Sequence, residues 1–107
     1  MGDGQHVWAA AEWALMMRNM FMREEENVLV IGSGIPEAWL RSGKPMSFGP
    51  GPTRFGAVTV SIRPGEGVGA RVSWKGEWRK RPTCIVVKVP GRKTMTLTDA
   101  GDGEVVV

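Results

Sequence analysis

The sequence predicts an α+β fold in which one N-terminal helix packs on an antiparallel β-sandwich or curled sheet. The first observation is that the segment from about Gln5 to Met22 contains no Gly or Pro and is rich in Ala, Leu, Met and Arg, which favour helices. The second is that short β-like runs follow it at spacings of about ten residues, each bounded by turn residues. A chain of 107 residues has room for one small core. We divide it into residues 1–26, the helix region, and 27–107, the β-sandwich-like region.

The predicted helix is apolar around most of its circumference. Asp3 can cap its N-terminus, and the acidic run Glu24–Glu26 would be unfavourable at the negative end of the helix dipole, so we expect the helix to end near Arg23. When residues are placed at about 100° per step, Glu12, Asn19 and Arg23 form one narrow polar strip. A helix with so little polar surface is normally covered on several sides. We therefore expect it to need neighbours, either other copies of the chain or the rest of a larger protein.

The Met-rich face of this helix is the predicted contact with a second copy. Methionine side chains adapt their shape to apolar partners, and a symmetric dimer uses the same face twice. We therefore expect a homodimer formed through the helix. The predicted interface consists of Trp13, Met16, Met17, Met20 and Phe21.

The β region begins soon after the helix. Asn27–Ile31 is predicted to be a buried strand, Glu37–Arg41 a short helical turn after a proline, and Met46–Pro52 a turn-rich connection. The strands expected after this connection are Arg54–Arg63, Val68–Trp74, Thr83–Val89, Thr94–Leu97 and Glu104–Val107. The first of these alternates in polarity, which is typical of an antiparallel strand with one buried and one wet face. The expected buried set is Val58, Val60 and Ile62, and the expected wet set is Thr59, Ser61 and Arg63.

Composition excludes several classes of protein. One cysteine, Cys84, rules out an intramolecular disulfide framework, and with a single histidine the chain lacks the usual ligand set of a zinc site. No metal or cofactor is therefore predicted, and a reducing, cytoplasmic compartment is favoured. No apolar run approaches the roughly 20 residues that cross a bilayer, so we expect no membrane contact. The net charge of +3 comes from scattered basic residues and neither requires nor excludes an anionic partner.

A glycine pair after the first predicted strand has the spacing of a dinucleotide-binding motif. It lies in Gly32-Ser33-Gly34, but the third glycine position holds Glu37 and the predicted helix there is only about one turn long. Neither a crossover helix nor a parallel second strand is expected after it. We therefore interpret these glycines as a turn.

A stretch in the β region combines aromatic rings with positive charges, a composition that suits bases stacked above phosphates. It is predicted to surround Gly76 at the tip of a hairpin. A solvated loop is the simpler interpretation, so the sequence does not favour nucleic acid as a partner. The residues of this stretch are Trp74, Lys75, Trp78, Arg79, Lys80 and Arg81.

No catalytic residue is predicted. His6 has no serine or cysteine nucleophile with a local signature beside it, and Cys84 lies in an apolar strand where a buried role is simpler. Asp3, Glu12 and Glu37 lie on separate elements, so nothing in the sequence brings two carboxylates together for glycoside hydrolysis.

Four segments of the chain form one succession. They are Gly2–Trp13, Val28–Ile31, the motif Gly34-Ile35-Pro36-x-x-Trp39-Leu40 and the motif Pro52-Thr53-x-Phe55-Gly56. Together they resemble the C-terminal region of bacterial six-hairpin glycosidases, in which a catalytic α/α barrel ends in a helix followed by a small β-sandwich. The resemblance extends to about Ile62 and implies a barrel helix without its barrel. The catalytic acid and base of that family lie on earlier barrel helices, so the resemblance implies no hydrolytic activity here.

The same resemblance places the start of the helix at a barrel rim. If the rim faces sugar, Trp8 would stack on a pyranose ring and His6 would hydrogen-bond a hydroxyl group; packing and capping at the helix start are the alternative roles. We therefore predict a non-catalytic module with a structural or weak carbohydrate-binding role. The alternatives are a self-associating interaction protein without enzymatic activity and a single-stranded nucleic-acid-binding module that uses residues 74–81.

Overall fold

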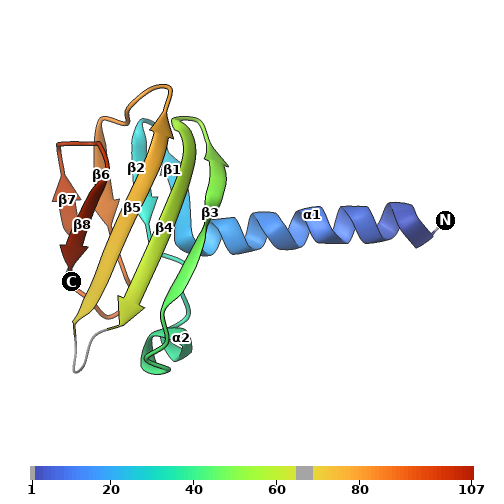
Figure 1. Cartoon of the computed structure of the whole chain (residues 1–107), viewed down its shortest axis with the longest axis horizontal. Helices are drawn as coiled ribbons and strands as arrows, with labels where there is room; N and C mark the ends of the chain where they lie inside the picture. Colours follow the sequence, from blue (N-terminus) through green and yellow to red (C-terminus); the bar gives the residue numbers. More distant parts are fainter. Residues whose placement is uncertain (1, 65–68) are drawn as a thin grey trace.

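The computed structural model describes residues 2–64 and 69–107, and within the first helix it describes side chains from Glu12 onward. Two four-stranded sheets form a sandwich, and a long helix projects from one edge of it (Figure 1). The elements in chain order are α1 (Gly2–Phe21), β1 (Met22–Glu25), β2 (Val28–Ile31), α2 (Glu37–Arg41), β3 (Met46–Thr53), β4 (Gly56–Pro64), β5 (Ala70–Trp78), β6 (Cys84–Val87), β7 (Met95–Leu97) and β8 (Gly103–Val106). This order confirms the predicted α+β fold of one N-terminal helix on a β-sandwich.

The sandwich consists of sheet A, with strand order β1-β2-β6-β7, and sheet B, with strand order β3-β4-β5-β8. Sheet B is antiparallel throughout. In sheet A the two outer pairs are antiparallel, but β2 and β6 run parallel. Parallel neighbours need a long connection, and here it contains α2 and three strands of sheet B. The chain therefore builds most of sheet B before it returns to sheet A.

The core lies between the sheets and is built from alternate residues of the strands. In β4, Val58, Val60 and Ile62 are buried, which confirms the predicted alternation, while Arg63 is exposed. The other large contributors are Val72 and Trp74 of β5, Leu29 and Ile31 of β2, and Ile85 and Val87 of β6.

The segment Met46–Thr53 is a strand, whereas the sequence predicted a turn-rich connection over Met46–Pro52. β3 lies at an edge of sheet B and pairs only with β4, and its register shifts between Phe48 and Gly51. Proline has no N–H to donate, but an edge strand tolerates it because one side of the strand has no neighbour. The glycines and prolines therefore mark an edge and a bulge here rather than a loop.

The helix ends at Phe21, earlier than the predicted end near Arg23, and residues 22–25, which we had assigned to the helix region, belong to sheet A. Antiparallel pairing of β1 with β2 provides hydrogen-bond partners for the backbone of this acidic segment. The carboxylate of Glu24 accepts hydrogen bonds from Arg18 and from the backbone N–H of Arg54. The acidic residues thus lie in and beside a paired strand with arginine partners, and they do not form the end of a longer helix.

Among the side chains described from Glu12 onward, those in the last turns of α1 contact the sandwich. The ring of Phe21 is buried and stacks on Phe48 of β3, with ring centroids 5.8 Å apart. Met17 and Met20 pack against the core and are partly buried. Nε of Arg18 donates a hydrogen bond to the carbonyl oxygen of Pro52 at 3.2 Å. The remainder of α1 projects away from both sheets (Figure 1).

Candidate functional site

Large apolar side chains are exposed on the projecting part of α1. Trp13, Leu15 and Met16 are 59%, 57% and 46% exposed, and we call these three residues the α1 apolar surface. Trp13 and Met16 lie on the same helix face as Met17 and Met20, because residues three and four apart are neighbours on a helix. The sandwich covers the second pair but does not reach the first. Among the described side chains, this apolar face is therefore covered by the sandwich at Met17 and Met20 and exposed to solvent at Trp13 and Met16.

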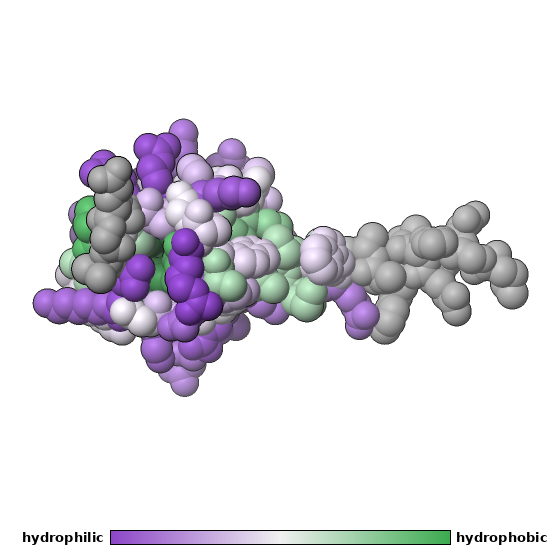
Figure 2. All heavy atoms as spheres, turned by 90° about the horizontal axis from the view of Figure 1, so that it is seen from below, coloured by the Kyte–Doolittle hydropathy of each residue, from purple (hydrophilic) through white to green (hydrophobic). Residues whose placement is uncertain are grey.

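An apolar notch lies where α1 leaves the sandwich beside the edge strand β3. Its volume is about 630 Å³. The bond from Arg18 to Pro52 ties its two walls together. Figure 2 shows hydrophobic surface around the base of the helix on this side of the molecule. The α1–β3 notch is lined by Ala14, Leu15, Arg18, Phe48, Pro50, Gly51 and Pro52.

The predicted helix interface is divided by the structure. Trp13 and Met16 are exposed and available to a partner. Met17 and Met20 already pack against the core of their own chain. Phe21 is only 1% exposed and stacks on Phe48, so its assignment to an interface with a second copy was wrong. The sequence pattern could not separate these groups, because all five positions share one helix face.

The predicted carbohydrate-binding residues lie at the far end of the helix. His6 and Trp8 belong to α1, but their side chains lie outside the described part of the structure. The N-terminal end of α1 lies away from both sheets (Figure 1). The proposed contacts of these two residues with sugar therefore stay a prediction.

The basic aromatic stretch is not a hairpin tip. Gly76 lies within β5, which runs to Trp78 and pairs with β4 along its whole length. Side chains alternate across a strand, so Trp74 points into the core while Lys75 points outward. Trp74 is 3% exposed, and its Nε1 donates to the carbonyl oxygen of Gly101 at 2.8 Å. Trp74 is therefore excluded from the predicted stacking surface. Trp78 is half-buried and lines a pocket with Arg81, while Lys75, Arg79, Lys80 and Arg81 are exposed.

Asp102, which the sequence analysis did not single out, fixes the second tryptophan. Its carboxylate accepts hydrogen bonds from the backbone N–H of Gly76 and from Nε1 of Trp78, each at 2.9 Å. These bonds, the first above all, lower the pKa of Asp102, and nearby Lys75 and Arg81 act in the same direction. The arrangement holds the loop before β8 against β5. Its partners lie on another strand, so no local sequence signal could have revealed it.

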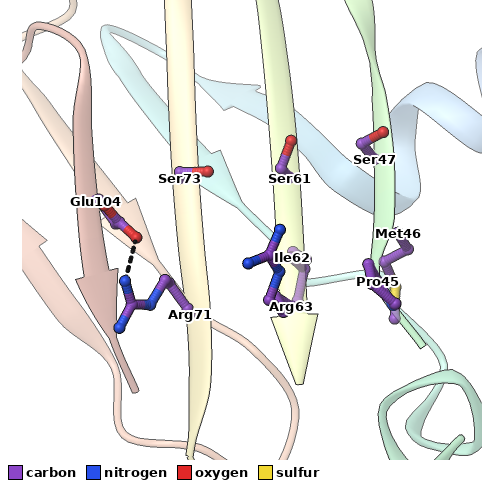
Figure 3. Close-up of a pocket in the computed structure, with 9 residues that line it drawn as sticks. All are labelled: Pro45, Met46, Ser47, Ser61, Ile62, Arg63, Arg71, Ser73 and Glu104. Carbon is purple, nitrogen blue, oxygen red and sulfur yellow. Dashed lines mark ion pairs between the residues drawn. The ribbon is translucent and has the colours of Figure 1, made fainter. Parts of the chain in front are cut away.

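The outer face of sheet B carries a polar hollow of about 340 Å³. Four residues lie opposite one another in a row across the four strands: Ser47, Ser61, Ser73 and Glu104. Two arginines, Arg63 and Arg71, face each other in the neighbouring row (Figure 3). Nη1 of Arg71 lies 3.2 Å from Oε1 of Glu104. Sequence analysis had placed Ser61 and Arg63 on a wet face but could not supply their cross-strand neighbours.

Two further classes of feature were sought in the described residues. No three His, Cys, Asp or Glu side chains within residues 2–64 and 69–107 come together as a candidate metal site. Over the same ranges, no helix has the combination of length and hydropathy that spanning a bilayer requires. Comparison with known proteins gives no further constraint: no family model, curated protein or solved structure matches the chain.

Proposed function

We propose that this chain is a non-catalytic structural module that assembles through α1, and that the partner of the isolated chain is a second copy. The observation that carries the proposal is the α1 apolar surface, in which Trp13 and Met16 are exposed on one face of the projecting helix and Leu15 on the other side. Soluble proteins rarely leave several large apolar side chains together unless they form a contact. The resemblance to the C-terminal region of six-hairpin glycosidases adds support, because it implies a helix that is normally surrounded by other helices.

The same chain offers both halves of a symmetric contact. The α1–β3 notch is apolar and is lined by Leu15, whereas Trp13 lies about 160° away around the helix. A twofold axis would set the helix of each copy against the notch of the other, and every contact would then occur twice. Burial of one large apolar side chain contributes about 1.5–3 kcal/mol. Leu15 lines the notch and is itself exposed, so it is expected to lie near the axis.

The oligomeric state of the purified chain tests the proposal. Sedimentation velocity over a wide range of protein concentrations should give a mass of twice 11.7 kDa, with reversible dissociation on dilution. The double substitution Trp13→Asp and Met16→Asp should give a monomer, because it places charges on the exposed face without reaching the core. Met17→Asp is a poorer choice, because Met17 also packs against the sandwich.

The matched control is Val106→Asp. Val106 is 62% exposed on the edge strand β8, so this change places a carboxylate at an exposed apolar position away from α1, one negative charge against the two of the double variant. The control should keep the mass of the wild-type chain, and the far-ultraviolet circular dichroism of all variants should retain the sheet signal. A wild-type chain that is monomeric at every concentration would contradict the proposal, as would a double variant that remains dimeric.

The weak carbohydrate-binding role implied by the resemblance stays a separate prediction. Titration of the fluorescence of the five tryptophans with a panel of oligosaccharides tests it. A saturable response that Trp8→Ala abolishes would support a sugar site at the start of α1. A response unchanged by that substitution would remove Trp8 from the site.

A further inference from the structure

We propose that the hollow on the outer face of sheet B binds an oxyanion group of a small ligand, a carboxylate, phosphate or sulfate. The group would lie between the guanidinium groups of Arg63 and Arg71 and above the hydroxyl groups of Ser61 and Ser73. These residues come from β4 and β5, and none comes from α1, so the inference does not depend on the proposed mode of assembly.

The register of β4 and β5 brings the two arginines together. Arg63 pairs with Arg71, and two positions away Ser61 pairs with Ser73. Residues two apart on a strand lie on the same face, and directly opposite residues have Cβ atoms about 4.5–5.5 Å apart. The four side chains therefore lie on one face of sheet B, where the Arg63 guanidinium lies beside Ser61 and the Arg71 guanidinium turns toward Glu104 (Figure 3).

The charge of this surface is incompletely balanced. Like charges directly opposite each other on neighbouring strands are destabilising. Glu104 forms an ion pair with Arg71, and within the described ranges no hydrogen bond or ion pair is made by the guanidinium of Arg63. Among the residues that the structure describes, the two arginines thus have one carboxylate partner, that of Glu104. An anion placed between them would relieve the repulsion and give Arg63 a partner.

The shape of the hollow suits a small ligand. Serine side chains are short, so the row of Ser47, Ser61 and Ser73 leaves a depression that Pro45 and Met46 border on one side. Its volume of about 340 Å³ lies at the lower end of the range for small-molecule sites. Hydroxyl groups donate to anionic oxygens, and guanidinium forks bind planar or tetrahedral oxyanions through two parallel hydrogen bonds. The chemistry of the site therefore matches one oxyanion rather than an apolar ligand.

Glu104 gives the proposal its sharpest test, because it competes with the ligand for Arg71. Replacing it by glutamine removes a negative charge from the hollow and frees Arg71, so Glu104→Gln should tighten binding several-fold. Arg63→Gln removes one of the two cations and should weaken binding about tenfold, the effect expected for a hydrogen bond to a charged group. The two substitutions change the site in opposite directions, which a general loss of folding would not do.

The experiment is a titration of the ¹⁵N-labelled full chain, followed by two-dimensional amide spectra, with sodium phosphate, sodium sulfate and sodium acetate in separate arms. Sodium chloride at equal ionic strength is the reference. We expect saturable shifts confined to the amides of 61–63 and 71–73 in at least one oxyanion arm, and the arm with the tightest binding identifies the group. Arg79→Gln is the matched control: Arg79 is exposed outside the hollow, so the same loss of charge there should leave the affinity unchanged.

Three results would overturn the proposal. The first is that chloride produces the same shifts as the oxyanions, which would mean that ionic strength and not oxyanion binding causes them. The second is that Arg79→Gln weakens binding as much as Arg63→Gln, which would reduce it to net charge. The third is that Glu104→Gln leaves the affinity unchanged or lowers it.

Discussion

The two halves of the described part of α1 contain similar side chains in opposite environments. Near the sandwich, Phe21 is buried and Met17 and Met20 pack against the core, whereas one or two turns earlier Trp13 and Met16 are exposed. The sequence of both halves is equally apolar. An apolar helix face therefore indicates that the helix needs neighbours, while the direction in which α1 leaves the sandwich decides which residues the chain itself covers.

Phe21→Ala and Trp13→Ala should have very different effects on the stability of the monomer. The first substitution removes a buried ring that stacks on Phe48 and should lower the free energy of unfolding by about 3–5 kcal/mol. The second removes an exposed ring and should change the free energy of unfolding by about 0.5 kcal/mol or less. Urea denaturation of each single variant, at protein concentrations low enough for the chain to be monomeric, measures both. Equal losses from the two substitutions would mean that the outer half of α1 is also covered within one chain.

Arg18→Ala should loosen the attachment of α1 to the sandwich. Arg18 donates to the carbonyl oxygen of Pro52 and bonds Glu24, and its loss leaves a partly buried carboxylate with fewer donors. We expect a cost of about 1–3 kcal/mol. Arg71→Ala is the control, because the pair of Arg71 with Glu104 is exposed and such pairs contribute about 0–1 kcal/mol. If the two substitutions cost the same amount in urea denaturation, Arg18 does not anchor the helix.

Acid pH should weaken the contact between Asp102 and Trp78 in the sandwich while leaving the helical structure of α1 unchanged. Hydrogen bonds from Gly76 and Trp78 hold the pKa of Asp102 below its ordinary value. A carboxylate with a lowered pKa in the folded state contributes stability that is complete above the unfolded pKa and is lost as the pH falls through the folded one. Acidification below about pH 4 should therefore release Trp78 and change its fluorescence.

Asp102→Asn is the matched variant for this titration. Its side-chain oxygen can still accept a hydrogen bond but does not titrate in this range. The acid-dependent change in fluorescence should disappear in the variant, while helical circular dichroism stays constant in both proteins. A change of the same size in Asp102→Asn would assign the effect to another group.

Sequence reasoning succeeded where local periodicity decides the outcome. The alternation of Val58, Val60 and Ile62 predicted the buried face of β4, and the helix-forming composition predicted α1. Sequence reasoning failed in β5, where the alternation rule was not applied, and in β3, where the edge position overrode the rule that proline marks a loop. The alternation rule, applied to β5, would have placed Trp74 and Lys75 on opposite faces. In β3 the edge position allowed prolines that a central strand would exclude.

The candidate sites depended on information that periodicity does not contain. The hollow exists because β4 and β5 pair in one particular register, and a shift by one residue would turn Arg71 toward the core. The sequence predicted that the apolar helix would need neighbours, which agrees with the exposed residues of the α1 apolar surface. Which of its residues the sandwich itself would cover depended on the angle at which α1 leaves β1, and that angle follows from packing rather than from any sequence pattern.

The parallel pairing of β2 with β6 has a consequence for the order of folding. These strands are far apart in sequence, and closing a long loop in an unfolded chain costs entropy that increases with loop length. The antiparallel pairs β3–β4 and β4–β5 lie within the connection, and their formation shortens the effective loop. We therefore expect β3, β4 and β5 to pair first and to bring β6 to β2. During synthesis, a chain whose β6 is still inside the ribosome would then contain the paired strands β3–β4–β5, while β2 would still lack its partner β6.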